Sequence, residues 1–428
     1  MKKNDLKELI KNRSNNLFCL VGPNSSGKTF FLSDVFNSLE DALFFHEDGR
    51  VTLSNNRKNV TIVNGDYLYI DDSNRGKALP SSFERDEISI DSQNIVNYST
   101  GKMKSIDTKH LSFGSEKLVR LLKTFISYNL NDIKYILLDE PENSLDDINL
   151  KVVAKLIEVL IENSKTVVMV SHSPRLLEIL KVDIDSVYVF SKPFEDEIKH
   201  SSFGYVISLF DSVGIKLMEL SDKYSADIKG YEKYVFKPGT PFRKHYIETI
   251  LHSYDFYKTL FYSEVILVEG LTELYLIKEI QRTLPISDNY YVAHGKNKVP
   301  FLLELFSLFC DSVKCFFDSD FKENGDPNSF SPALTNFINE NYEKRTTLYC
   351  IPKDIETFLG IDMKSIIMGI TNDPEMTKSQ SDNFKQKYKE YLCLHAIASN
   401  LNAKKKIIKL FSEKTFDDFL TDEGNEKQ

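Results

Sequence analysis

The sequence predicts an α/β protein built from two separate domains. Two stretches of the chain alternate short β-rich runs with helical patterns, which indicates βαβ units and largely parallel sheets. The length of 428 residues also exceeds what one compact core usually holds. We therefore expect a first α/β domain at 1–200, a helical linker at 201–262, a second α/β domain at 263–362 and a helical tail at 363–428.

The first stretch begins with LFCLVG, a short apolar run typical of a buried strand. Similar runs predict the strands of this domain at 17–22, 61–70 (as one strand or two), 135–139, 167–171 and 186–190. Helical patterns predict its helices at 29–39, 116–128 and 148–162. The polar region at 72–110 is expected to be an irregular insertion.

The second stretch repeats this alternation after a segment at 200–262 that is mainly helical in pattern. Its strands are expected at 264–268, 290–294, 313–318 and 347–351, and its helices at 272–284, 299–310 and 332–342. The tail beyond residue 362 is rich in Lys and helical in pattern.

Composition limits the classes of function. A net charge of −9 argues against a uniformly basic surface, yet permits a local basic groove for nucleic acid beside acidic clusters that hold metal. The five cysteines form no CxxC pair, which favours buried reduced thiols over zinc or disulfides. The N-terminus is charged and then polar, and its first apolar run is too short to span a bilayer. We expect a cytoplasmic protein without a membrane partner.

A phosphate-binding loop is predicted where GPNSSGKT follows an apolar strand and opens a helix. Gly22 and Gly27 would let the backbone wrap closely around phosphates, and Asn24 lies within the same loop. Lys28 would reach the β- and γ-phosphates, and the Thr29 hydroxyl would ligate Mg²⁺. ATP and Mg²⁺ are therefore the predicted cofactors.

Two adjacent carboxylates end the run YILLDEP. Asp139 would hold Mg²⁺ through its water shell, and Glu140 would polarise the attacking water. The alternative, two acids that cap the following helix, loses weight because the pair follows a phosphate-binding loop in the same stretch.

Three further segments resemble the motifs of ABC-type ATPases. LSFGSEK, at 111–117, resembles the signature, with Ser112 and Gly114 at the head of a helix and Ser115 as an alternative to Ser112 for the phosphate contact. SLD, at 144–146, resembles the D-loop, and His172 resembles the switch histidine that senses the γ-phosphate. This resemblance implies that the signature of one subunit completes the ATP site of another, in a homodimer or a higher even-numbered oligomer.

Carboxylates follow two strands of the second stretch. Glu269 and Glu273 come after one strand, and Asp318 and Asp320 come at the end of another. Both sets should emerge at the carboxyl edge of a parallel sheet, where α/β active sites form. Clustered carboxylates repel one another unless a divalent cation neutralises them, and Mg²⁺ or Mn²⁺ suits all-oxygen ligands. The alternative for Glu273 is an acid that stabilises the first turn of its helix.

Glu-Gly after one strand and DxD after a later one resemble the Toprim domain, over residues 263–362. The order VEGLTELYLI, HGKNKVPFL, FFDSD and KDIETFL, preceded by an ABC-type ATPase, resembles the OLD family (overcoming lysogenization defect) of ATPase–Toprim nucleases. The resemblance implies two-metal cleavage of DNA, often in antiphage defence. It adds Glu356 as a further acidic participant, with Asp354 as an alternative, and a basic residue of the tail, for which the Lys run at 404–406 is the obvious source.

Compact relatives of this family act beside a reverse transcriptase in retron systems, so that enzyme with its RNA/DNA product is a further expected partner. The competing hypothesis is a non-catalytic, ATP-gated DNA clamp or sensor that resembles RecF or SMC heads. The intact set of acids favours the nuclease.

Overall fold

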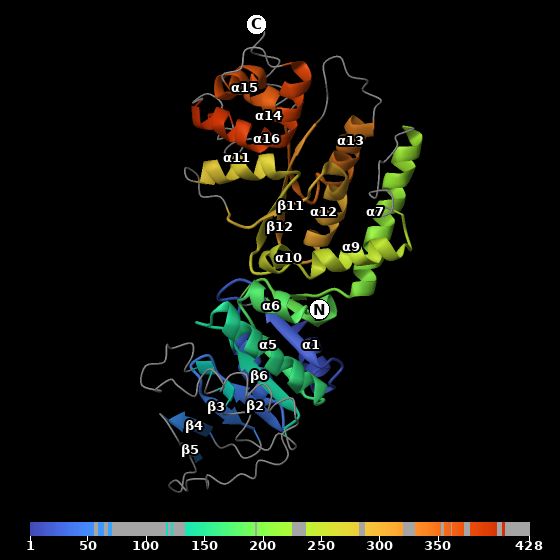
Figure 1. Cartoon of the computed structure of the whole chain (residues 1–428). Coiled ribbons are helices and arrows are strands. Elements are labelled where there is room, and N and C mark those ends of the chain that lie inside the picture. Colours follow the sequence, from blue (N-terminus) through green and yellow to red (C-terminus); the bar gives the residue numbers. More distant parts are fainter. Residues whose placement is uncertain are drawn as a thin grey trace. The chain divides into compact units, whose positions relative to one another are not determined.

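A computed structural model of the chain describes residues 1–54, 59–63, 67–70, 117–118, 121–122, 133–192, 195–224, 237–281, 287–319, 330–351, 355–360, 362–371, 377–399 and 405–406. They form two compact units, Met1–Phe203 with Thr249–Tyr262, and Gly204–Glu248 with Ser263–Gln428. Residues 201–262, predicted as a linker, are thus divided between the units. Each unit contains a sheet with helices beside it (Figure 1), which confirms the mixed α/β class and the largely parallel pairing.

The first unit contains a sheet whose described strands run in the order β5-β4-β3-β2-β6-β7-β1-β8-β9. Their bounds are β1 Leu17–Val21, β2 Ala42–Phe45, β3 Val51–Leu53, β4 Asn59–Val63, β5 Tyr67–Ile70, β6 Tyr135–Asp139, β7 Thr166–Val170, β8 Val187–Phe190 and β9 Ile198–Lys199. In the central run β2-β6-β7-β1-β8, each strand pairs in parallel with its neighbour. At the two sides of the sheet, β3, β4, β5 and β9 pair antiparallel.

The helices of the first unit are α1 (Lys3–Lys11), α2 (Lys28–Asn37), α5 (Asp147–Glu162), α6 (Pro174–Leu180) and α10 (Tyr254–Thr259), with the 3₁₀ turn η4 at Ile184–Ser186. Leu6 of α1 and Leu32 of α2 belong to one buried cluster with Phe18 of β1 and Phe190 of β8. The strands β6 and β7 are buried at every residue. Such apolar strands are typical of a parallel sheet covered on both faces.

The second unit contains a four-stranded sheet in the order β11-β10-β12-β13, in which every described pair is parallel. Its strands are β10 (Glu264–Val268), β11 (Tyr290–Val292), β12 (Ser312–Asp318) and β13 (Thr347–Ile351). Its helices are α7 (Phe203–Lys223), α9 (Pro241–Leu251), α11 (Leu271–Gln281), α12 (Val299–Ser307), α13 (Phe330–Tyr342), α14 (Ile355–Leu359), α15 (Met363–Thr371) and α16 (Lys378–Ser399), with the 3₁₀ turn η5 at Lys296–Lys298.

Described residues of the predicted helical tail belong to the core of this second unit. Leu392 of α16 and Ile277 of α11 lie in one buried cluster with Val268 of β10 and Phe316 of β12. The helices α11, α15 and α16 lie side by side in Figure 1, and α12 packs against β12 and β10. In the described part of the chain, no helix combines the length and apolarity needed to cross a membrane.

Candidate functional site

The loop between β1 and α2 has the backbone that a phosphate-binding loop requires. Gly22, Ser25 and Gly27 have φ angles of 133°, 61° and 89°. A Cβ at Gly22 would lie 2.1 Å from the main-chain oxygen of Phe190, so the close approach of two backbones excludes every larger residue there. Gly27 then caps α2, whose N-terminal N–H groups can bind an anion.

Lys28 folds back onto this loop. Its Nζ donates hydrogen bonds to the carbonyls of Gly22 (2.9 Å) and Pro23 (2.8 Å) and to the Ser26 hydroxyl (3.2 Å). Burial lowers the pKa of Lys28 to about 8, although the nearby carboxylates, Glu140 foremost, favour its charge. The ammonium is therefore already placed where phosphate oxygens can replace the carbonyls as its acceptors.

The Thr29 hydroxyl meets the carboxylate at the end of β6. Thr29 Oγ1 donates to Asp139 Oδ1 at 3.1 Å, although the two residues come from different elements. Burial raises the pKa of Asp139, and the hydrogen bond from Thr29 opposes that shift. A hydroxyl and a carboxylate side by side, next to an anion-binding loop, fit the oxygen ligands that Mg²⁺ prefers.

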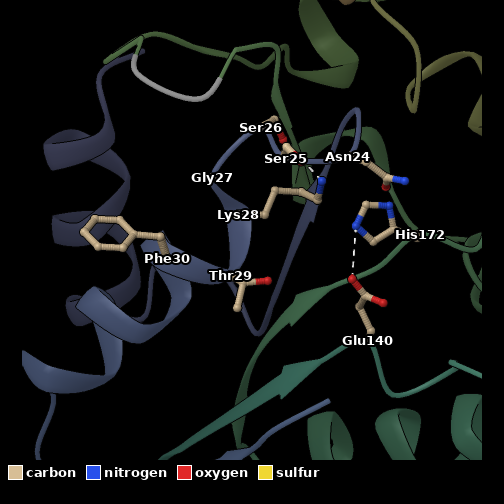
Figure 2. A pocket seen from close by; sticks show the side chains of 9 residues that line it. All are labelled: Asn24, Ser25, Ser26, Gly27, Lys28, Thr29, Phe30, Glu140 and His172. Atoms are coloured by element: carbon tan, nitrogen blue, oxygen red, sulfur yellow. Dashed lines mark hydrogen bonds and ion pairs between the residues drawn. The ribbon is translucent and has the colours of Figure 1, made fainter. Parts of the chain in front are cut away.

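Glu140 and His172 face each other across the mouth of the loop. His172 Nε2 lies 3.2 Å from Glu140 Oε1, as the dashed line in Figure 2 shows. Burial, followed by Lys28, lowers the pKa of His172 to about 4, so the contact joins a neutral imidazole to the Glu140 carboxyl group and is not an ion pair. Burial, followed by Glu47, raises the pKa of Glu140 to about 7. A carboxylate with that pKa can accept a proton from water near neutral pH.

A pocket of about 460 Å³ unites these residues. The loop from Asn24 to Thr29, Glu140 and His172 line it, together with Phe30, which is 80% exposed and whose ring points away from Lys28 (Figure 2). Apart from Gly22 and Asp139, which lie next to these residues, each predicted nucleotide contact in the described ranges is in its lining.

The remaining predicted nucleotide motifs are only partly described. Ser112, Gly114 and the alternative Ser115 lie outside the described residues. In the predicted D-loop, Asp146 caps α5 by accepting a hydrogen bond from the amide of Asn149 at 2.9 Å. That contact is a local structural role for Asp146.

Two buried charged residues were not predicted for this site. Lys117 is 4% exposed and Glu142 is 8% exposed, and both contact the loops that carry Glu140 and His172. The sequence signal for Glu142 is a further acid directly after YILLDEP, and Lys117 closes the signature segment. Neither signal reveals burial.

In the second unit, the structure brings Glu269 and Asp318 together. The two residues stand at the carboxyl ends of the neighbouring parallel strands β10 and β12, where Val268 is in register with Phe316. Glu269 Oε2 accepts a hydrogen bond from the main-chain N–H of Asp318 at 3.2 Å. Both carboxylates therefore lie at the edge of the sheet at which an α/β active site forms.

Glu273 has the capping geometry that was weighed as its alternative role. Its Oε2 accepts a hydrogen bond from the amide of Gly270 at 2.8 Å, at the start of α11. The side chain is 6% exposed. One carboxylate oxygen thus satisfies the helix terminus, a favourable position for a negative charge.

The other predicted acids of this unit are less completely described. Asp320 and Asp354 lie outside the described residues, and Glu356 stands on α14, after β13. Lys406, from the Lys run, donates to the carbonyl of Phe358 at 3.2 Å. Within the described ranges, no three His, Cys, Asp or Glu side chains are grouped closely enough to hold a metal ion.

Lys296 was not predicted for this edge either. It lies in η5 after β11, is 6% exposed, and its Nζ is 3.5 Å from the Thr335 hydroxyl, which donates to the carbonyl of Ser319 at 3.0 Å. A buried cation thus stands beside the segment that follows Asp318.

The sequence matches no protein-family model and no curated protein. Among solved structures, the chain is similar to one described as a metal-chelate type ABC transporter in an inward-facing conformation, with 16% sequence identity and a TM-score of 0.28. That likeness covers 45% of this chain and 73% of the other. At such a distance it carries no argument about activity, which must be inferred from the two sites themselves.

Proposed function

We propose that the first unit binds and hydrolyses ATP with Mg²⁺. The observation that supports this most directly is the 3.1 Å contact between Thr29 Oγ1 and Asp139 Oδ1 beside the phosphate-binding loop. The two side chains come from segments far apart in sequence, and each belongs to a motif that the sequence predicts independently of the other. A glycine-rich turn unrelated to nucleotide binding would not be expected to lie beside a carboxylate of the second motif.

In the proposed reaction, the loop amides and Lys28 bind the phosphates, while Thr29 and Asp139 would hold Mg²⁺, which neutralises the β- and γ-oxygens when bound. Glu140 orients the attacking water and accepts its proton, which its pKa of about 7 permits. His172, which contacts Glu140, would respond to the γ-phosphate. A second copy of the chain would supply the signature segment, so ATP would join two subunits.

We further propose that the second unit is a divalent-metal-dependent endonuclease of the OLD type, with a Toprim domain. Support comes from the order of its motifs and from the meeting of Glu269 with Asp318 at the carboxyl edge of a parallel sheet. These two residues with Glu273 and Asp320 would hold Mg²⁺ or Mn²⁺, and Glu356 would be a further acidic participant. Bound metal would activate water and stabilise the leaving 3′ oxygen of DNA.

The decisive experiment is cleavage of supercoiled plasmid with Mg²⁺ or Mn²⁺, with and without ATP. Wild-type protein should nick the plasmid, and Asp318→Ala should bind ATP normally yet leave the plasmid intact. Absence of cleavage by the wild-type protein under all four conditions would contradict the nuclease proposal and leave the ATPase proposal standing.

The second candidate function is an ATP-gated DNA clamp without catalysis. The observation that favours it is that Glu273, one of the predicted acids, caps α11 by accepting a hydrogen bond from the amide of Gly270. This candidate predicts ATP-dependent association with DNA and no cut product with either metal. The resemblance to the OLD family also suggests a role in antiphage defence. Some compact members of that family act beside a reverse transcriptase, and co-purification of the two proteins would test this partner.

A further inference from the structure

Two charged side chains lie behind the ATP pocket without lining it. Lys117 and Glu142 are 4% and 8% exposed, respectively, whereas the lining consists of the loop residues with Glu140 and His172. A buried charge is costly unless it is paired and hydrogen-bonded. Their contacts therefore indicate what they do.

Glu142 fixes the loop that carries the switch histidine. Its Oε1 accepts hydrogen bonds from the Ser171 hydroxyl (2.8 Å) and from the main-chain N–H of His172 (2.6 Å). Ser171 Oγ also accepts from the amide of Ser173, which in turn caps α6 through Leu176. One buried carboxylate thus holds the whole turn from β7 to α6, and with it the backbone of His172.

Lys117 fixes the loop that carries the catalytic glutamate. Its Nζ donates to the carbonyl of Glu140 at 2.5 Å. Glu140 has a φ of 46°, a left-handed conformation that a non-glycine residue adopts only when its surroundings hold it there. Burial lowers the pKa of Lys117, while the charges of Glu142 and Glu47 oppose that shift, so the ammonium and the Glu142 carboxylate stabilise each other.

We propose that Lys117 and Glu142 are positioning residues for ATP hydrolysis, an inference that rests on the proposed ATPase function. Lys117 acts through the carbonyl of Glu140, and Glu142 acts through the main chain of His172. Together they set the 3.2 Å contact between the Glu140 and His172 side chains, which Figure 2 shows at the pocket.

This role predicts a split between binding and catalysis. Neither residue lines the pocket, so the Kd for ATP should change by no more than about 3-fold in their variants. Glu142→Ala removes the acceptor of two hydrogen bonds and should lower kcat roughly 100-fold, the cost of a catalytic group displaced by about 1 Å. Glu142→Gln retains an acceptor oxygen and should retain kcat within about 5-fold.

Lys117→Met tests the second contact, and the chain offers a matched control. Lys165 also donates to a main-chain carbonyl, that of Ile133 at 2.8 Å. This contact lies where β6 and β7 begin, whereas Glu140 and His172 follow the ends of these two strands. Lys117→Met should lower kcat roughly 100-fold. Lys165→Met should leave kcat unchanged, even if it lowers the melting temperature of the protein as much as Lys117→Met does.

The measurements are single-turnover ATP hydrolysis, titration with a fluorescent ATP analogue, and thermal melting of the full chain. Wild-type protein that binds ATP and hydrolyses none would overturn the proposed ATPase function. If wild-type protein hydrolyses ATP, two results would overturn the positioning role alone. One is an unchanged kcat in Glu142→Ala, and the other is an equal loss of kcat in Glu142→Ala and Glu142→Gln. If Glu142→Ala does not fold, unchanged kcat in Lys117→Met overturns it instead.

Discussion

The two candidate sites differ in how their charged groups are held. In the ATP site, side chains from separate segments bind one another, as Thr29 binds Asp139 and His172 binds Glu140. In the acidic site, the described contacts of Glu269 and Glu273 are with main-chain N–H groups. The first site thus shows contacts between side chains of separate segments, whereas the second shows carboxylates that accept from the main chain, where a divalent cation would offset their mutual repulsion.

The largest expected effect sharpens this difference in the acidic site. Glu269→Gln retains the acceptor for Asp318 N–H but loses the charge, so plasmid cleavage should fall roughly 1000-fold, because a metal supplies several kcal/mol of stabilisation. The matched control is Glu264→Gln on the same strand, where Glu264 pairs with Lys314 at 3.0 Å. Equal cleavage by the two variants would remove Glu269 from the proposed site.

The next effect concerns the ATP site. Lys28→Ala removes an ammonium that is already placed on the loop, and charge-assisted hydrogen bonds of this kind contribute about 1.5–3 kcal/mol each. ATP affinity should fall roughly 100-fold in a fluorescence titration. Lys165→Met serves again as the control, and an unchanged affinity in Lys28→Ala would contradict the phosphate-binding role of the loop.

A third prediction tests whether the loop is built by close backbone contact. Gly22→Ala would bring a Cβ within 2.1 Å of the Phe190 main-chain oxygen, so the free energy of unfolding should fall by about 2 kcal/mol or more. Gly204→Ala, in a helix with open space around it, should be neutral or stabilising by up to about 1 kcal/mol. Circular dichroism during urea denaturation measures both, and similar midpoints would disprove the contact.

The smallest expected effect is on pH dependence. Glu140 must be deprotonated to act as a base, so with its pKa of about 7, and with Lys28 half deprotonated at pH 8, the kcat/KM for ATP should rise about fivefold between pH 6 and pH 8. Lys28, with a pKa of about 8, loses its charge at higher pH, so kcat/KM should then fall. In Glu140→Gln, kcat/KM should no longer rise with pH. If the rise persists in that variant, the titration of another group causes it.

The sequence was informative where residues repeat a pattern that packing requires. Strands β1, β6 and β7 are almost entirely apolar because both faces of the sheet are covered. The loop from Gly22 to Thr29 could be predicted equally well, because few residue types can adopt its backbone conformation.

Other features depend on tertiary contacts that no local pattern announces. Strand β2 is a four-residue run beside β6, and α1 buries only Leu6 and Ile10 within a charged segment. The burial of Lys117 and Glu142 follows from neighbours distant in sequence. Glu273 shows a further limit, because a helix-capping acid and a metal ligand occupy the same first turn.

The most direct test measures ATP hydrolysis and plasmid nicking in parallel on wild-type protein, Lys28→Ala and Asp318→Ala. The account predicts that wild-type protein shows both activities, that Lys28→Ala loses hydrolysis, and that Asp318→Ala loses nicking while it hydrolyses ATP normally. Nicking that survives in Asp318→Ala, or its absence from wild-type protein with either metal, would contradict the account.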